Sequence, residues 1–179
     1  MNPQKYAHVK FHPWVGQRYW DEVRWGFRAM VLGESHYGGN EERAAFTIKV
    51  IGDVVNGLDI GWRTRLFTKT ARLFQLAAED KRADRDECRD FWQDVLFYNY
   101  IQDYIAGPRI PPTSEVWESS RAAFDEVVEI HCPELILVLG KRLGDHFKLH
   151  VQCKKRIFLA FKSTILNPED GNTKPGCCI

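Results

Sequence analysis

The stretch Met-Val-Leu-Gly-Glu-Ser-His-Tyr-Gly-Gly (residues 30–39) decides the fold that we expect for this chain. An apolar run from Phe27 to Leu32, with one arginine in it, ends at Gly33 and is followed at once by an acid, a hydroxyl, an imidazole and a phenol. The pattern predicts a buried strand that delivers four usable side chains into one loop. Pockets in open α/β sheets form beyond the carboxyl ends of the strands, so this loop is a candidate site. The alternative is a strand and a polar turn in which the two final glycines supply unusual dihedral angles.

The composition indicates one globular domain. The chain has 179 residues, of which 44% are hydrophobic and 13% aromatic. A chain of this length buries a core without a disulfide framework, and we expect a single domain over residues 1–179. The 25 basic and 24 acidic residues nearly cancel. The net charge therefore does not indicate a protein that binds nucleic acid, although a local basic face is compatible with this balance.

The cysteines and the N-terminus bear on the compartment. Five cysteines, an odd number without a C-x-x-C pair, argue against a zinc site and against a secreted disulfide scaffold. The first residues lack the apolar core of a signal peptide, and no stretch approaches the roughly 20 apolar residues that cross a bilayer. We therefore expect a cytoplasmic protein with reduced thiols and no membrane association.

Outward from residues 30–39, strand and helix patterns alternate along the chain. Strands are expected at Arg28–Leu32, Val95–Asn99, Glu134–Leu139 and Arg156–Phe161. Helices are expected at Tyr19–Trp25 (with Trp20 against the sheet), Glu41–Val55 (with Ala44, Ile48, Ile51 and Val55 as its apolar spacing), Trp62–Ala77, Lys81–Asp94 and Lys141–His150, and after a cap at Thr113 or Ser114. Strands separated by helices imply right-handed crossovers and a parallel sheet. The expected fold is α/β: a three-layer α/β/α sandwich with a central, mainly parallel four-stranded sheet.

Polar side chains follow three of the expected strands. Residues 34–37 follow the first strand, Asn99 ends the second, and Asn167 lies near the last. Parallel strands put these ends on one edge of the sheet, so Glu34 and Asn99, which are 65 positions apart, can line a single pocket. Neither a glycine-rich phosphate loop nor a G-x-S-x-G elbow is present, so two common α/β chemistries lose support.

The order and spacing of these motifs resemble the uracil-DNA glycosylase superfamily. That family opens its site with a strand and a loop of the G-Q-D-P-Y-H, G-E-x-P-G or G-M-N-P-G type, and this chain has Gly-Glu-Ser-His-Tyr-Gly at residues 33–38. The family's second motif, an apolar strand ending in asparagine, is matched by Leu-Phe-Tyr-Asn at residues 96–99. A loop with proline and arginine, an acidic helix start and an apolar strand closing in Leu-Gly follow at residues 107–112, 114–117 and 133–140. The resemblance covers roughly residues 28–140 and implies the family's fold.

The resemblance also implies roles for matching residues. An extruded nucleotide would enter the pocket, because the enzyme cannot reach the glycosidic bond of a stacked base. Glu34 would orient or deprotonate the attacking water, and Asn99 would hydrogen-bond the polar edge of the base. Further base contacts are implied for Gly33, Ser35, Tyr37 (which would screen base size) and Phe46 (which would stack on the base). A phenylalanine on an amphipathic helix also fits the core.

The chain departs from the family pattern in ways that bear on the reaction. The family proline is His36 here, and the third motif, His-Pro-Ser, is replaced by Asn-Pro-Glu at residues 167–169. The amide of Asn167 can donate to the departing base, whereas the carboxylate of Glu169 would repel a DNA phosphate. His36 could supply the missing electrophile if it points into the pocket; the alternative is a loop histidine that bonds locally. The family's iron–sulfur cluster lacks its cysteine ligands, so no cofactor is expected.

Three functions stay open. The first is a monomeric DNA glycosylase that flips a damaged or modified base and hydrolyses its N-glycosidic bond, with Arg109, Lys141 and Arg142 on the DNA backbone. The second is a relative that has lost catalysis and binds DNA, a nucleotide or a protein partner, which the absent His-Pro-Ser motif favours. The third is an unrelated hydrolase that uses Glu34 with His36.

Overall fold

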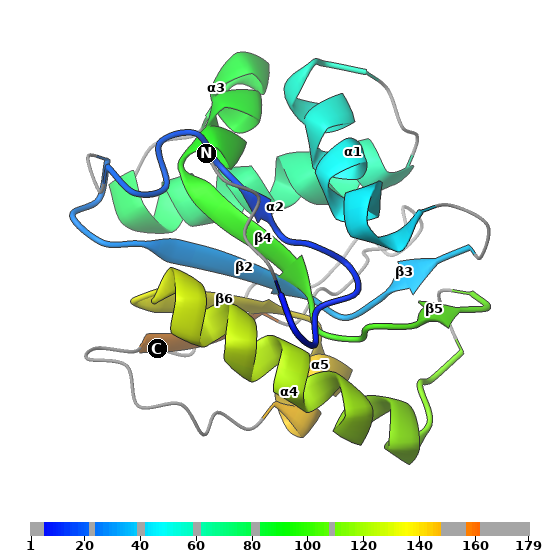
Figure 1. Cartoon of the computed structure of the whole chain (residues 1–179). Coiled ribbons are helices and arrows are strands. Elements are labelled where there is room, and N and C mark those ends of the chain that lie inside the picture. The colour runs from blue at the N-terminus through cyan, green and yellow to red at the C-terminus, as the bar shows by residue number, and fades with distance from the viewer. Residues whose placement is uncertain are drawn as a thin grey trace, which may run out of the picture.

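A computed structural model describes residues 6–21, 24–38, 42–58, 62–79, 83–107, 110–147 and 157–161. This part of the chain forms a mixed α/β fold (Figure 1). Its strands are β1 (Trp14–Val15), β2 (Ala29–Gly33), β3 (His36–Tyr37), β4 (Val95–Asn99), β5 (Tyr104–Ile105), β6 (Leu135–Leu139) and β7 (Ile157–Phe161). Its helices are α1 (Arg43–Val55), α2 (Trp62–Glu79), α3 (Arg85–Asp90), α4 (Ser114–His131) and α5 (Lys141–His146), with a 3₁₀ turn η1 (Phe91–Gln93).

The main sheet has the strand order β1-β4-β2-β6-β7. Strands β4, β2, β6 and β7 run parallel, and β1 pairs antiparallel with β4. The expected mainly parallel sheet is therefore confirmed, with β1 as an edge strand that the sequence did not predict. Strands β3 and β5 form a separate parallel pair in which His36 faces Tyr104. The carboxyl ends of β2, β4 and β6 meet at one edge of the main sheet, because these neighbours run parallel.

Alternate residues of the central strand pack on opposite faces of the sheet. Met30 and Leu32 of β2 belong to one core cluster, which includes Phe124, Val127 and Val128 of α4. Ala29 and Val31 belong to a second cluster, which includes Ile51 of α1, Phe67 of α2 and Phe91 of η1. Helices α1 and α2 thus cover one face of the sheet and α4 the other (Figure 1). This two-sided cover explains why every residue of β2 and β4 is buried.

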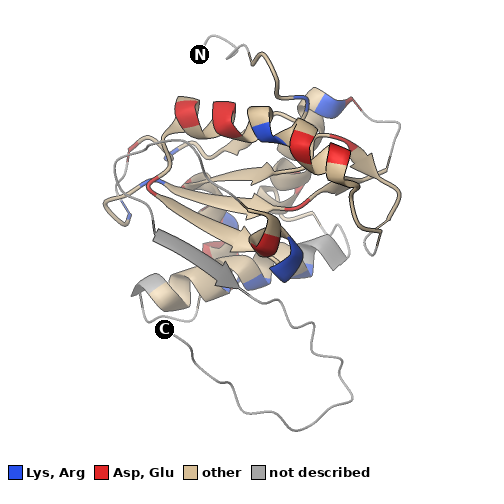
Figure 2. Cartoon of the chain, turned by 90° about the horizontal axis from the view of Figure 1, so that it is seen from below, with Lys and Arg blue, Asp and Glu red and all other residues tan. Residues whose placement is uncertain are grey.

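Helix α4 separates polar from apolar residues. Thr113 caps it by accepting a hydrogen bond from the backbone N–H of Val116, which confirms the predicted start. Glu115, Glu118 and Glu129 of this helix are exposed. Figure 2 shows acidic positions spread along the helix. None of the helices in the described ranges combines the length and the hydrophobicity that a membrane crossing requires.

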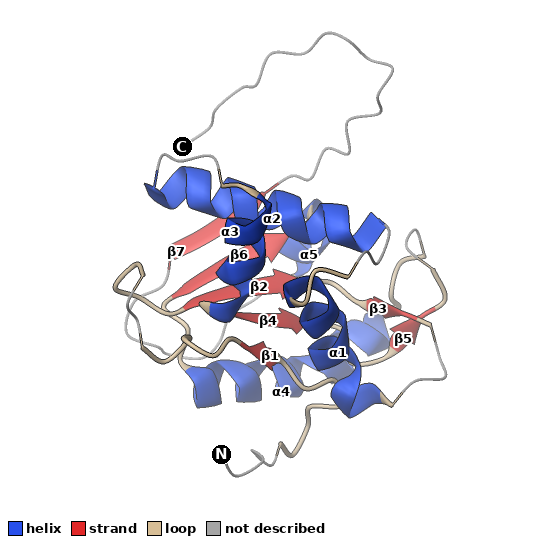
Figure 3. Cartoon of the chain, turned by 90° about the horizontal axis from the view of Figure 1, so that it is seen from above, coloured by secondary structure: helices blue, strands red, loops and turns tan. Residues whose placement is uncertain are grey.

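Two predicted helices differ from the structure. Residues 17–21 and 24–25, within and beside the expected helix Tyr19–Trp25, form turns, and the side chain of Trp20 is 48% exposed instead of packed on the sheet. In residues 83–94, the described part of the expected helix Lys81–Asp94, the helix α3 (Figure 3) begins after Asp84 and is followed by η1. The side chain of Asp84 forms a capping box with Glu87. The cap stops the helix from beginning earlier in this polar stretch.

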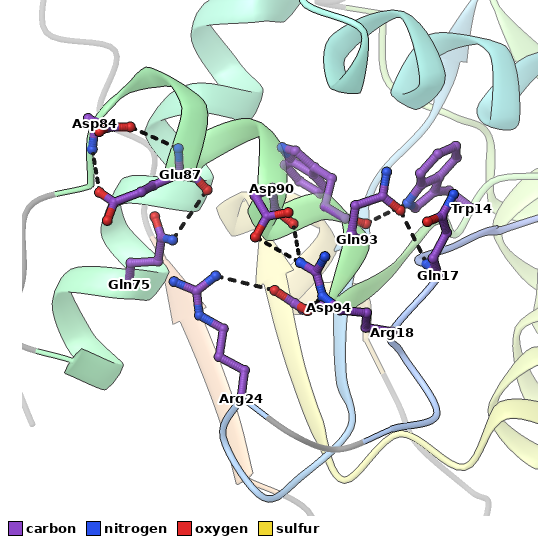
Figure 4. A network of polar contacts seen from close by, with 11 residues as sticks. Trp14, Gln17, Arg18, Arg24, Gln75, Asp84, Glu87, Asp90, Gln93 and Asp94 are labelled. Atoms are coloured by element: carbon purple, nitrogen blue, oxygen red, sulfur yellow. Dashed lines mark hydrogen bonds and ion pairs between the residues drawn. The ribbon is translucent and has the colours of Figure 1, made fainter.

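A polar network joins the N-terminal segment to the chain before β4 (Figure 4). The carboxylate of Asp94 accepts hydrogen bonds from Nε of Arg18 at 2.6 Å and from Nη1 of Arg24 at 3.2 Å. Arg18 also pairs with Asp90 at 2.8 Å. Because Asp94 directly precedes β4, the network lies at the amino end of that strand. It anchors the N-terminal segment at the edge of the sheet opposite Asn99.

Candidate functional site

The ends of β2 and β4 place two of the predicted site residues side by side. Gly33 and Asn99 are register partners at the last position of each strand. Pairing continues beyond them, because the backbone N–H of Tyr100 donates to the carbonyl of Gly33 at 3.0 Å and that of Ile101 to the carbonyl of Glu34 at 2.8 Å. Glu34, directly after β2, and Asn99, the last residue of β4, therefore lie at adjacent strand ends, and the segments that follow run together out of the sheet.

The side chain of Asn99 is buried between Gly33 and His36. Its amide nitrogen lies 3.1 Å from Nδ1 and 3.2 Å from Nε2 of the His36 ring. Its amide oxygen lies so close to Gly33 that a Cβ there would be 2.0 Å away. The main-chain carbonyl of Asn99 accepts a hydrogen bond from the side chain of Gln102 at 3.0 Å. His36 and Gly33 thus confine the side-chain amide, and Gln102 holds the main chain of Asn99.

His36 lies in a buried polar and aromatic cluster. Its Nε2 is 2.8 Å from the hydroxyl of Thr47, on α1. Its ring centroid lies 4.8 Å from that of Phe11 and 4.8 Å from that of Phe46. The amide nitrogen of Asn99 is almost equally far from both ring nitrogens, so it lies over the face of the His36 ring and not in the ring plane. In this arrangement the imidazole orients Asn99.

Glu34 forms a two-pronged ion pair with Arg142, the second residue of α5. Nε of Arg142 donates to Oε2 of Glu34 at 2.8 Å, and Nη2 donates to Oε1. The carboxylate side chain is 15% exposed and the arginine side chain 37%. The hydrogen bonds to Glu34 raise the pKa of Arg142 above its ordinary value. The pair links the loop after β2 to the helix after β6, in the bidentate geometry that is strongest for these groups.

The other predicted residues are spread around this pair. The hydroxyl of Ser35 is buried and has no hydrogen-bond partner in the described part of the chain. Tyr37 is half-buried and lies near enough to Arg142 to raise the pKa of that arginine. Phe46 is buried in the core, against His36 and Tyr104. Lys141 is exposed at the first position of α5. Arg109 and Asn167 lie outside the described residues.

Sequence reasoning missed the residues that hold His36 and Asn99 in place. Gln102 is buried, and its side-chain oxygen accepts from the backbone N–H of Lys10 at 2.9 Å and of Phe11 at 3.0 Å. It thereby fixes Phe11 against the His36 ring. The available signal was a glutamine three residues after Asn99, next to an apolar strand. No signal marked Thr47, which lies on the buried side of α1.

The arrangement places a carboxylate paired with an arginine, a buried amide and an exposed lysine at one edge of the sheet. Among the residues that the structure describes, no group of three or more His, Cys, Asp or Glu side chains is placed to hold a metal ion. Comparisons with models of protein families, with curated proteins and with solved structures found no match. Function is therefore inferred from the chemistry of these side chains and from the motifs in the sequence.

Proposed function

We propose that the protein is a uracil-DNA glycosylase-like enzyme, which takes up a damaged or modified base flipped out of DNA and hydrolyses its N-glycosidic bond. A three-layer α/β/α sandwich of that family's type is part of the proposal. The observation that carries it is the neighbouring origin of Glu34 and Asn99, at the ends of β2 and β4, together with the ion pair between Glu34 and Arg142. It supports the proposal because the motifs that resemble the family converge at one edge of the sheet.

The reaction requires a carboxylate that can act on water and on positive charge. Hydrolysis of an N-glycosidic bond builds positive charge on the sugar, which an ionised acid stabilises. A carboxylate has about four lone-pair directions, and the fork of Arg142 uses one on each oxygen of Glu34. The remaining directions serve to orient the attacking water and accept its proton. Base entry exchanges the contact between Asn99 and His36 for a contact with the base edge, and the hydroxyl of Ser35 offers a further bond.

The charge distribution favours an approach of DNA at the carboxyl edge of the sheet. The exposed acids of α4 (Figure 2) repel phosphates over that face. Lys141 is exposed at the start of α5, beside the Glu34–Arg142 pair. Lys141 and Arg109 are the proposed phosphate contacts, which strengthen binding without reading sequence.

A second function, binding without catalysis, is favoured by a specific observation. Both oxygens of Glu34 already accept hydrogen bonds from Arg142, and the amide nitrogen of Asn99 already contacts His36. In a relative that has lost base excision and binds DNA, a nucleotide or a protein partner, Glu34 and Asn99 would not need to contact a base. These two side chains would then keep their contacts within the protein permanently.

Base release separates the two functions. Single- and double-stranded oligonucleotides carrying uracil, hypoxanthine, xanthine, 5-hydroxymethyluracil or an alkylated purine are incubated with the protein, and alkali-labile abasic sites are counted. We expect release of at least one base, with a loss on the order of 100-fold or more in Glu34→Gln. The matched control is Glu129→Gln, on the exposed side of α4. Equal activity of wild type and Glu34→Gln removes the assigned chemistry, and salt-dependent DNA binding without base release selects the second function.

A further inference from the structure

Arg142 has two conceivable roles that the sequence does not separate. As one of two adjacent bases, Lys141 and Arg142, it fits a phosphate contact. The structure instead directs its guanidinium at Glu34, with Nε and Nη2 both donating to the carboxylate. A guanidinium that is engaged in a bidentate pair has fewer donors and less net charge to give to DNA. Lys141, the exposed neighbour, carries its charge toward solvent.

The ion pair between Glu34 and Arg142 also reduces the electrostatic repulsion between the acid and DNA. An isolated carboxylate near the phosphate backbone is repelled, and its side chain rotates among several conformers. The fork of Arg142 fixes the plane of the Glu34 carboxylate and balances its charge, while a lone-pair direction stays open on each oxygen. The side chain of Glu34 keeps 15% of its surface exposed, which leaves an edge for water.

We propose that Arg142 is a positioning residue of the reaction, which acts through Glu34 by fixing its carboxylate and balancing its charge next to DNA. This inference rests on the proposed function. It assigns the phosphate contact at the start of α5 to Lys141 alone. The two adjacent residues therefore have different effects on catalysis and on binding.

The test compares kcat, KM and the salt dependence of DNA binding among matched variants. The substrate is the oligonucleotide of the panel above that the wild-type protein processes fastest. Arg142→Gln is expected to lower kcat on the order of 100-fold, because a misplaced catalytic group loses about that much. Its KM is expected to rise as well, because the Glu34 carboxylate, no longer balanced by Arg142, repels the phosphate backbone. Arg142→Lys keeps the charge without the fork, so its kcat lies between those of the wild type and Arg142→Gln.

Two further variants calibrate the readouts. Lys141→Gln is expected to raise Kd and to reduce the salt slope by about one, as loss of a phosphate contact does. Arg121→Gln removes an arginine that is paired with Asp125 on α4 at 3.6 Å, and is expected to leave kcat and the salt slope unchanged. Circular dichroism and thermal unfolding show whether each variant is folded.

The outcomes distinguish this inference from the proposed function. Release of no base from the panel by the wild-type protein overturns both. An active wild type with full kcat in Arg142→Gln, combined with a raised Kd and a smaller salt slope, overturns the inference alone and makes Arg142 a phosphate contact. If Arg142→Gln does not fold, wild-type kcat in a folded Arg142→Lys overturns the inference as well, because the fork would then be dispensable.

Discussion

The amide oxygen of Asn99 lies against Gly33, its register partner across β2 and β4, so that a Cβ at position 33 would be 2.0 Å from that oxygen. Position 33 needs glycine because of this approach, and not because of a left-handed dihedral angle, since Gly33 is absent from the glycines with positive φ. The glycine of the loop motif and the asparagine of the second motif therefore depend on each other through space.

Replacing Gly33 with alanine should displace the Asn99 amide. We expect Gly33→Ala to lower the free energy of unfolding by about 1–3 kcal/mol, the usual range for overpacking a buried position, and to reduce any base release. Denaturant unfolding measures the first effect. The control is Gly52→Ala in α1, where a Cβ would lie 3.8 Å from the Trp14 ring and stability should rise by about 0.4–1 kcal/mol. Wild-type stability in Gly33→Ala would show that Asn99 is not confined as described.

Gln102 should contribute strongly to stability, because three of its hydrogen bonds are buried or partly buried. It accepts from the backbone of Lys10 and Phe11 and donates to the carbonyl of Asn99. Truncation in Gln102→Ala leaves these groups unpaired and should cost about 3 kcal/mol in urea unfolding. The matched control is Gln93→Ala, which loses an exposed bond from Gln17 at 3.3 Å and should cost less than about 1 kcal/mol. Equal costs for the two variants would contradict the assigned role.

His131 should make the protein sensitive to acid. Its side chain is 1% exposed, and burial lowers its pKa from 6.5 to about 4. Burial also raises the pKa of Tyr6 to about 12, and the hydroxyl of this tyrosine forms a hydrogen bond of 2.8 Å with Nε2 of His131. Between pH 6.5 and 4 the unfolded chain binds a proton at His131 that the folded chain does not. Stability from this residue is therefore complete above pH 6.5 and decreases by roughly 3 kcal/mol as the pH falls to 4.

The measurement is denaturant unfolding of the wild type and of His131→Gln across this pH range. The variant should lose less stability on acidification, because glutamine does not titrate. His8→Gln, at an exposed position, serves as the control and should follow the wild type. Parallel curves for the wild type and His131→Gln would refute the linkage.

Asp94 should matter more than other acids of its region. Its side chain is 7% exposed and pairs with both Arg18 and Arg24 (Figure 4). In Asp94→Asn both arginines lose a charged partner, and the free energy of unfolding should fall by about 1–3 kcal/mol. Asp86, which is 88% exposed and pairs with Arg89, supplies the control. Asp86→Asn should change stability by less than about 0.5 kcal/mol. Similar effects in the two variants would argue against a structural role for the network.

The parallel sheet was predictable because its strands are buried runs. The expected strands Val95–Asn99 and Glu134–Leu139 match β4 and β6 to within one residue. Apolar residues on both faces mark such strands without any knowledge of their neighbours. Strands β1, β3 and β5 have two residues each and carry no such pattern. Their pairing depends on contacts with distant segments.

The adjacency of the two strand ends was predictable, and the side-chain contacts that form there were not. The parallel sheet implied that Glu34 and Asn99 would come from neighbouring strand ends, and they do. The apolar spacing predicted for α1 is right at Ile51, which is buried, and wrong at Ile48, which is 44% exposed. The buried face of α1 instead includes Phe46, which packs against Phe11 of the N-terminal segment. The pairing of Glu34 with Arg142 spans 108 residues, and no local period in the sequence distinguishes Arg142 from Lys141.

Strand β2 is paired with β4 on one side and with β6 on the other. Glu34, which follows β2, is therefore less mobile than its partner Arg142. Backbone amides in such a central strand exchange with deuterium only when the whole domain unfolds. The backbone that leads to Glu34 is therefore rigid. Arg142 belongs to a helix of six residues, a length that is marginal by itself. Any transient separation of the two charges will therefore begin with fraying of α5, and deuterium uptake there will report it first.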